Sequence, residues 1–267
     1  MEKVFIVAAK RTAIGKMMGS LSGINPADMA AKVIRNILEE TKLDPSVIDE
    51  VIVGNILMAG QKQGIARQAS VKAGIPHHVP AYSVNMICGS GMKSIMNGCN
   101  SILAGQASVV LAGGVENMSA SGFVMQGIRE GIKMGDFKAV DHMVCDGLTD
   151  AFGNYHMGVT AENIAERYNI TREQQDAFSF QSQQKAIRAI DAGKFRDEIV
   201  PVEIVSKKET LVFDTDEFPN RATTLEKMAN LRPAFKKDGT VTAANASGIN
   251  DGASFVLLAS EKAIKAV

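Results

Sequence analysis

The sequence has few cysteines and no surplus of charge, and both shortages exclude classes of protein. Its 267 residues include three cysteines, Cys88, Cys99 and Cys145. An odd count without paired spacing fits a reducing compartment rather than a disulfide framework. Lys and Arg together number 29, as do Asp and Glu, so the formal net charge is zero. A nucleic-acid-binding protein would show a basic surplus, so we expect no nucleic-acid partner.

Signals for metal binding, membranes and export are also missing. No Cys-x-x-Cys or His-Glu-x-x-His string occurs and the four histidines are scattered, so we expect no metal site. No apolar stretch approaches the roughly 20 residues that span a bilayer. The N-terminal residues enter a strand-like apolar run at once, without the features of a secretory signal or a transit peptide. These absences favour a cytoplasmic protein without a membrane partner.

What is present is an alternation of short apolar runs with helical patterns. Strands are predicted at the apolar runs 4–9, 51–53, 81–85 and 109–112. Helices are predicted between them, from Pro26 onward, at 65–74 and at 88–105. After Pro26 the apolar residues recur at helical spacing, at Met29, Val33, Ile34, Ile37 and Leu38. This alternation predicts an α/β fold whose mixed, largely parallel sheet is flanked by helices.

The character of the chain changes at residue 116. Residues 116–245 carry more charge, many methionines and Gly-punctuated loops. Two helices are predicted there, at 161–168 and at 172–192, the second capped by Thr171. Short strands are predicted at 198–205 and 210–213. We interpret 116–245 as an inserted α+β domain on a core formed by 1–115 and 246–267, in which a strand resumes at 252–259.

The last residues begin like a capped helix at Ser260 and stop without a Gly or Pro terminator. An isolated helix that short is marginally stable. The chain is therefore expected to be a truncated form of a longer protein.

Cys88 has the surroundings that point most strongly to chemistry. A strand run ends at Asn85 and a Gly-rich turn follows, so Cys88 is expected at the N-terminus of a helix. The unpaired N–H groups and the helix dipole there stabilise a thiolate. Gly89 and Gly91 leave room for a substrate and for hydrogen-bond donors, as covalent acyl transfer requires. A lone cysteine is, however, more often a buried core residue than a nucleophile, and the residue pattern leaves both interpretations open.

The helix after Cys88 is expected to be buried. Its apolar residues follow a 4-3-4-3 spacing that predicts one shared face: Cys88, Met92, Ile95, Cys99 and Ile102. Cys99 lies in the middle of this helix and is expected to fill the core. Cys145 is also expected to be structural.

The string Asn-x-x-Cys-Gly-Ser-Gly-Met-Lys-Ser around Cys88 resembles the acyl-enzyme signature of thiolases. Residues 7–16, 112–119, 231–235 and 245–253 also resemble thiolase motifs, in the family's order, and the resemblance covers the whole chain. It implies the N-terminal half of a biosynthetic thiolase, including an inserted loop domain, with the C-terminal half absent. It also implies that Cys88 is the nucleophile.

The resemblance implies a reaction and its substrates. Cys88 takes an acetyl group from acetyl-CoA, and a second acetyl-CoA attacks the thioester to give acetoacetyl-CoA and CoA; the reverse is thiolysis. CoA thioesters are substrates here, and no cofactor is expected. The implied partners are these substrates, the chain's own C-terminal half and further copies of the chain, as a dimer or tetramer.

The resemblance also assigns CoA contacts. The string Tyr-His-Met-Gly from Tyr155 resembles the short-chain branch, in which His156 and Met157 lie near the pantetheine and the acyl group. Further expected contacts match family positions and are Leu148, Phe235, Ala243 and Ser247. Arg221 lies near an arginine that contacts the nucleotide, about one residue out of register. Residues 129–142, with Lys133 and Lys138, match a tetramer-forming loop and cationic patch, or else form a solvated charged face.

Three family motifs, Gly-His-Pro, Cys-x-Gly-Gly-Gly and Asn-Glu-Ala, do not occur in the 267 residues. Turnover is therefore expected to need the missing half. The alternatives are a degradative 3-ketoacyl-CoA thiolase and a β-ketoacyl carrier-protein synthase. From another class, the alternative is a non-catalytic acyl-CoA-binding or assembly fragment.

Overall fold

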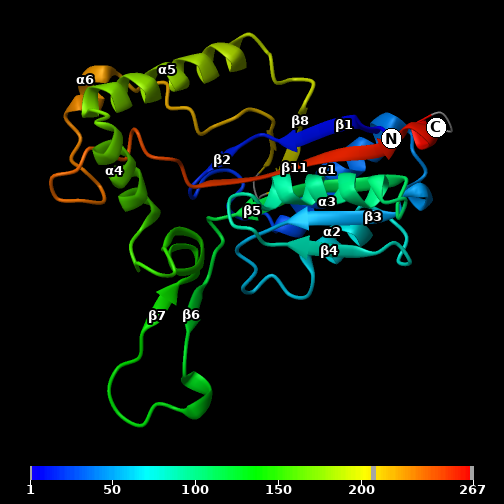
Figure 1. Ribbon diagram of the computed structural model, residues 1–267, viewed down its shortest axis with the longest axis horizontal. Helices are drawn as coiled ribbons and strands as arrows, with labels where there is room; N and C mark the ends of the chain where they lie inside the picture. The colour runs from blue at the N-terminus through cyan, green and yellow to red at the C-terminus, as the bar shows by residue number, and fades with distance from the viewer. Residues whose placement is uncertain (1, 206–208, 265–267) are drawn as a thin grey trace. The chain divides into compact units, whose positions relative to one another are not determined.

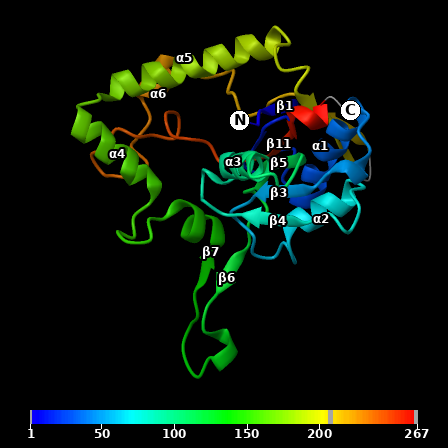
Figure 2. The same cartoon turned by 45° about the vertical axis from the view of Figure 1, so that its right-hand side comes forward.

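The computed structural model describes residues 2–205 and 209–264, which form two compact units (Figures 1 and 2). The first unit holds the residues up to 121, with 196–215 and those from 250 onward; the second holds 122–195 and 216–249. The sequence interpretation placed 196–215 in the insertion. In the structure this segment groups with the first unit because β8 (Ile199–Val200) pairs in parallel with β1 (Val4–Thr12).

The first unit is built on a sheet of seven described strands in the order β4-β3-β5-β11-β1-β8, with β2 pairing to β11. The remaining bounds are β2 Gly15–Lys16, β3 Glu50–Gly54, β4 Ala81–Val84, β5 Val109–Asn117 and β11 Asn250–Ser260. Of these strands, β11 is antiparallel to its neighbours β5, β1 and β2, whereas the β3–β4, β3–β5 and β1–β8 pairs are parallel. The predicted mixed, largely parallel sheet is thus confirmed. In a separate two-stranded sheet, β9 (Val202–Val205) pairs antiparallel with β10 (Thr210–Phe213).

Helices α1 (Pro26–Thr41) and α2 (Ile65–Lys72) cover one face of the sheet. Asn25 caps α1 by accepting a hydrogen bond from Ala27 N at 2.9 Å, and Pro26 suits the first helical position because its missing N–H has no intrahelical partner there. The five apolar residues expected to share a face of this helix are all buried against the main core. A short 3₁₀ helix, Pro45–Val47, leads into β3.

Helix α3 (Ser90–Leu103) covers the opposite face, and its orientation corrects the sequence prediction. Its buried residues are Ser90, Ser94, Gly98 and Ile102, spaced four apart, whereas Met92 is 71% exposed. The helix lies against strands that carry glycines: a Cβ at Gly54 would come within 2.5 Å of the Gly91 N atom. Only small side chains fit such a close approach, so Met92 faces away from the sheet while Ile102, near the other end of the helix, is buried.

The second unit contains a hairpin and three helices. Strands β6 (Phe123–Met125) and β7 (Ala139–Asp141) form the hairpin, with a 3₁₀ turn at Ile128–Glu130 between them. A π-helical turn (Met143–Leu148), α4 (Met157–Tyr168), α5 (Arg172–Asp191) and α6 (Leu225–Ala229) follow. The predicted Thr171 cap of α5 is confirmed as a full capping box with Gln174.

Near the end of the described chain, α7 (Glu261–Ile264) begins where a capped helix was expected, and residues 265–267 lie outside the description. Within residues 2–205 and 209–264, no helix combines the length and apolarity needed to cross a membrane.

Candidate active site

Cys88 lies on a tight turn between β4 and α3. The helix begins at Ser90 with Gly89 as its N-cap, so Cys88 precedes the helix rather than starting it as predicted. The reason is Ile87, whose φ of 47° places the chain in the left-handed region and reverses its direction before helical geometry can start. A β-branched residue rarely adopts this conformation, and such strain is concentrated at functional sites. The turn leaves the Cys88 side chain exposed.

Short hydrogen bonds hold this turn in place. The Ser90 Oγ donates to the Ile87 carbonyl oxygen at 2.6 Å and accepts from Met86 N at 2.9 Å. The Ile87 N–H donates to Asn85 Oδ1 at 3.1 Å. The strained backbone therefore has its polar groups satisfied locally, and the position of the cysteine is fixed.

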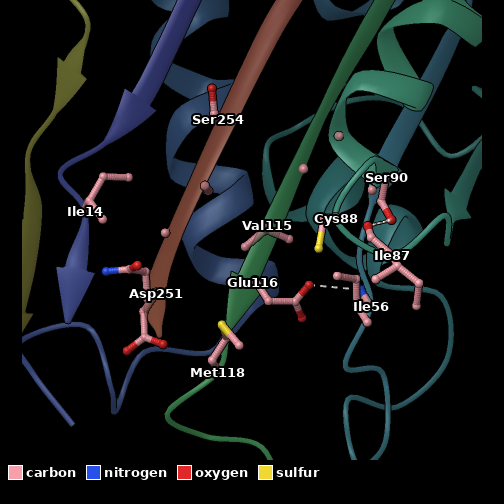
Figure 3. A pocket seen from close by; sticks show the side chains of 16 residues that line it. Ile14, Ile56, Ile87, Cys88, Ser90, Val115, Glu116, Met118, Asp251 and Ser254 are labelled. Atoms are coloured by element: carbon pink, nitrogen blue, oxygen red, sulfur yellow. Dashed lines mark hydrogen bonds between the residues drawn. The ribbon is translucent and has the colours of Figure 1, made fainter. Parts of the chain in front are cut away.

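Cys88 lines a pocket of about 370 Å³ formed within the first unit (Figure 3). Its walls come from the starts of α3 and β11 and from the ends of β3 and β5, and include Ile56, Val115, Met118 and Asp251. The lining residues include no Lys, Arg or His. The side chains that line this pocket therefore bring no cationic group to the Cys88 sulfur.

One pocket wall depends on Glu116, which the sequence analysis did not single out. Its carboxylate accepts a hydrogen bond from Ile56 N at 2.9 Å (Figure 3). It also accepts from Leu57 N at 3.0 Å and from the Asn55 side-chain amide at 2.9 Å. Glu116 thus ties the segment after β3 to the end of β5. Its position near the end of a buried strand, shortly after the Gly113-Gly114 pair, was the available signal.

Asp251 is a second pocket residue that was not predicted from the sequence. It is 1% exposed, and its two carboxylate oxygens accept from the N–H of Ser119 at 3.0 Å and from the Ser119 hydroxyl at 2.6 Å. The same hydroxyl oxygen accepts from Met18 N at 2.8 Å. This chain of hydrogen bonds joins β11 to the segments that follow β5 and β2. It therefore fixes the floor of the pocket.

The other two cysteines differ from Cys88. Cys99 is half-buried against the smaller core cluster, as expected, and burial raises the pKa of its thiol. Cys145 was expected to be structural but is exposed; desolvation and the neighbouring Asp146 carboxylate raise the pKa of its thiol. Both groups are therefore held more strongly in the unreactive thiol form than an ordinary cysteine.

In the second unit, His156 and Phe235 form a stacked pair. Their ring centroids are 4.7 Å apart with an interplanar angle of 17°. His156 is the N-cap of α4, because its Nδ1 accepts from Gly158 N at 2.9 Å. Met157, the first residue of α4, is 38% exposed. The structure therefore brings together two of the predicted CoA contacts, with a third beside them in the chain.

The remaining predicted contacts lie elsewhere in this unit. Leu148 ends the π-helical turn and is half-buried, whereas Ala243 and Ser247 are exposed on the segment that precedes β11. Arg221 makes a bidentate pair with Asp191, its Nη2 lying 2.6 Å from Oδ1 and its Nη1 3.1 Å from Oδ2. These positions leave the contact assignments as predictions.

A buried polar network supports the segment that precedes β11, and it was not predicted from the sequence. Glu162, 4% exposed, accepts from Thr240 N and Val241 N at 2.9 and 2.8 Å. Asp176, 5% exposed, binds the Asn245 amide at 2.8 Å and Arg172 Nε at 2.7 Å. In the sequence, these residues are only acidic positions within predicted helices. Such a position does not show whether the carboxylate is buried or solvated. In the described ranges no three His, Cys, Asp or Glu side chains cluster so as to hold a metal ion.

Comparison with known proteins identifies relatives along the whole chain. The family model described as the thiolase N-terminal domain matches residues 4–262. An acetyl-CoA acetyltransferase of Pseudomonas aeruginosa is 55% identical over all of this chain and 68% of its own length. An acetyl-CoA acetyltransferase of Allochromatium vinosum is 51% identical over 99% of this chain and 67% of its own length.

A solved structure extends the likeness to the fold. The crystal structure of the Bacillus anthracis acetyl-CoA acetyltransferase matches with a TM-score of 0.96 and 39% identity, covering all of this chain and 67% of that one. The chain thus spans about two thirds of the length of these relatives. With a family match over nearly every residue and a fold to agree with it, the chain belongs to the thiolase family.

Proposed function

We propose that this chain carries the nucleophile and acyl-accepting site of an acetyl-CoA acetyltransferase. The observation that supports this most directly is the exposed Cys88, fixed on a strained turn at the wall of an open pocket. Relatives named acetyl-CoA acetyltransferase, 51–55% identical to it, support the choice of acetyl-CoA.

The proposed reaction has two steps. In the first, the Cys88 thiolate attacks the thioester carbon of acetyl-CoA; the C–S bond to CoA breaks, CoA leaves as its thiolate and takes up a proton, and acetyl-Cys88 remains. In the second, another acetyl-CoA loses an α-proton to a base, and its α-carbon attacks acetyl-Cys88. Acetoacetyl-CoA forms and the Cys88 thiolate is released. Thiolysis is the reverse.

The base for the second step is not assigned to this chain. The family motifs that supply a second cysteine and a histidine do not occur in these 267 residues. We therefore assign the first step to this chain and propose that turnover requires a protein that also carries those motifs.

We assign CoA contacts to Leu148, His156, Met157, Arg221, Phe235, Ala243 and Ser247. The exposed Ser247 hydroxyl can hydrogen-bond an amide of the pantetheine, and the apolar side chains can line its path. In this proposal the CoA thioester is the substrate, no cofactor takes part, and the reaction takes place in the cytoplasm.

The experiment that tests the proposal is intact-mass spectrometry after incubation with acetyl-CoA. We expect the chain to gain one acetyl group and Cys88→Ala to gain none. Cys99 and Cys145 serve as internal controls, because their raised pKa values disfavour the thiolate. CoA binding without acetylation would instead support an acyl-CoA-binding module without chemistry. Acetylation at Cys99 or Cys145 alone would refute the assignment of the nucleophile.

We further propose that the protein is a homotetramer joined through the β6–β7 hairpin. Large apolar side chains are exposed along it: Phe123 is 68% exposed, Phe137 54% and Met134 95%. Apolar groups so fully exposed on one hairpin favour burial against another surface. Arg129, Lys133 and Lys138 lie in the same segment and would keep its rim charged.

A further inference from the structure

One face of α4 holds the loop that carries Phe235. Gly158 and Glu162 are one helical turn apart and so lie on the same side of the helix. The loop itself is closed by a hydrogen bond from Ala234 N to Val241 O at 2.9 Å. The loop contacts α4 at these two residues. Gly158 contacts the ring of Phe235, and Glu162 binds the other end of the loop.

Gly158 is the first of these two contacts. A Cβ added at Gly158 would overlap the ring atoms Cγ, Cδ1 and Cδ2 of Phe235. The ring therefore lies directly on the backbone of α4, in space that every other residue type would fill. The φ angle of Gly158 is not positive, so the requirement for glycine comes from the ring and not from the turn of the chain.

Glu162 is the second contact. Its carboxylate accepts from Thr240 N at 2.9 Å, from the Thr240 hydroxyl at 3.0 Å and from Val241 N at 2.8 Å. A Cβ at Gly239 would overlap the same carboxylate. Buried charge-assisted bonds of this kind are stronger than neutral ones and fix the loop at its far end.

Gly158 also determines the hydrogen-bonding state of His156. Its N–H donates to the imidazole Nδ1 at 2.9 Å, so that nitrogen acts as an acceptor and bears no proton. A neutral imidazole then carries its single proton on Nε2. Gly158 thus touches both members of the His156–Phe235 pair, one through its N–H and the other through its missing side chain.

We infer that Gly158 and Glu162 are positioning residues for the acyl-CoA site, which set the Phe235 ring against His156 and leave the imidazole Nε2–H to donate to a carbonyl oxygen of the CoA thioester. The inference rests on the proposed function, in which His156 and Phe235 contact that substrate. Neither positioning residue needs to touch the substrate itself.

Histidine NMR of the unliganded chain tests the positioning directly. The chain has four histidines, so the His156 ring signals can be identified from their loss in His156→Gln. We expect an Nε2-protonated tautomer and ring protons shifted by the stacked Phe235. The shift should disappear in Phe235→Ala, in Gly158→Ala and, to a smaller degree, in Glu162→Gln. Gly122→Ala is the matched control, because Gly122 lies in the same unit and a Cβ there meets nothing within 4 Å.

CoA binding, measured by calorimetry, tests the consequence. We expect Gly158→Ala to raise the Kd about tenfold, as overpacking of a fixed contact does, and Gly122→Ala to leave it unchanged. The double variant Gly158→Ala/Phe235→Ala should bind no worse than Phe235→Ala alone, because the added methyl group then has no ring to displace. The alkylation rate of Cys88 by iodoacetamide should stay within about twofold in each variant, since the hydrogen bonds that hold its turn are made within the turn itself.

Two results would overturn the inference. One is an unshifted His156 signal, or an Nδ1-protonated ring, in the unaltered chain. The other is a Gly158→Ala substitution that raises the Kd for CoA by the same factor in the Phe235→Ala background as in the unaltered chain. That result would make Gly158 a general structural residue. Absence of CoA binding by the unaltered chain would refute the CoA site of the proposed function, while the NMR comparison would still decide whether Gly158 and Glu162 hold the stacked pair.

Discussion

The hydroxyl of Ser90 donates a hydrogen bond of 2.6 Å to the carbonyl oxygen of Ile87. This bond closes the turn that contains Cys88. We expect Ser90→Ala to cost about 1–2 kcal/mol in unfolding free energy, because Ser90 is buried and the substitution leaves Met86 N without its partner. Acetylation of Cys88 should slow about tenfold, since its position is no longer fixed. Urea unfolding and time-resolved mass spectrometry measure the two effects. Ser182→Ala, at an exposed site on α5, is the control, and an unchanged acetylation rate in Ser90→Ala would contradict the role given to this bond.

Replacing Glu116 by Gln should loosen the pocket wall. The amide of Gln presents an NH₂ group where the carboxylate accepts from Asn55, Ile56 and Leu57, so at least one donor loses its acceptor. We expect a loss of about 1–3 kcal/mol, measured by denaturant unfolding. Glu130→Gln, at an exposed site in the hairpin, should change stability by less than about 0.5 kcal/mol. Equal stabilities of the two variants would show that the Glu116 bonds do not stabilise the fold.

Glu162 makes the second unit sensitive to acid. Burial alone would raise its pKa, but the hydrogen bonds from Thr240 and Val241 outweigh burial and hold the pKa below its ordinary value of 4.5. A depressed pKa means that the stabilisation is fully present above pH 4.5 and is lost as the pH falls through the lower folded-state value. Urea unfolding at neutral pH and at steps below pH 4.5 should show this loss in the unaltered chain and less of it in Glu162→Gln. The exposed Glu39→Gln should follow the unaltered chain, and a Glu162→Gln profile that did the same would contradict the assignment.

The hairpin residue Met134 should control self-association. Met134→Lys places a charge where 95% of the side chain is exposed, so it should leave the fold of the monomer intact. If the hairpin joins subunits, the variant should show a smaller mass by light scattering, because burying an unpaired charge opposes association. Lys133→Gln is the neighbouring control. An unchanged assembly size in Met134→Lys would place the subunit interface elsewhere.

The elements that the sequence predicted well are those whose pattern depends on one buried face. The apolar spacing after Pro26 predicted α1 and its core residues, and Thr171 predicted the start of α5. The α3 face was predicted only in part. Ile102 is buried and Ile95 and Cys99 pack against the smaller core cluster, whereas Met92 is exposed and the small residues Ser90, Ser94 and Gly98 are buried instead. Which face of a helix is buried depends on what it packs against, and here the glycines of β3 and β5 decide it.

The candidate site divides in the same way. The strand and the glycines around Cys88 marked it as a candidate, and the resemblance to thiolases implied its role as the nucleophile. The left-handed Ile87 could not, since local preference for a β-branched residue opposes that conformation. Glu116, Asp251 and Glu162 were missed because a buried carboxylate is defined by donors that lie far away in sequence; Glu162 and Val241 are 79 positions apart.

The place of β11 in the sheet has a consequence for the order of assembly. This strand lies between β5 and β1, and its ladder with β1 pairs Val4 with Ser260. During synthesis, β1 therefore has no partner in β11 until residues 250–260 have been made. Contacts across so long a separation are slow to form, and both waiting strands expose an open edge meanwhile. Between the synthesis of β1 and that of β11 the centre of this sheet is unfilled, and exposed strand edges of this kind can pair with another chain.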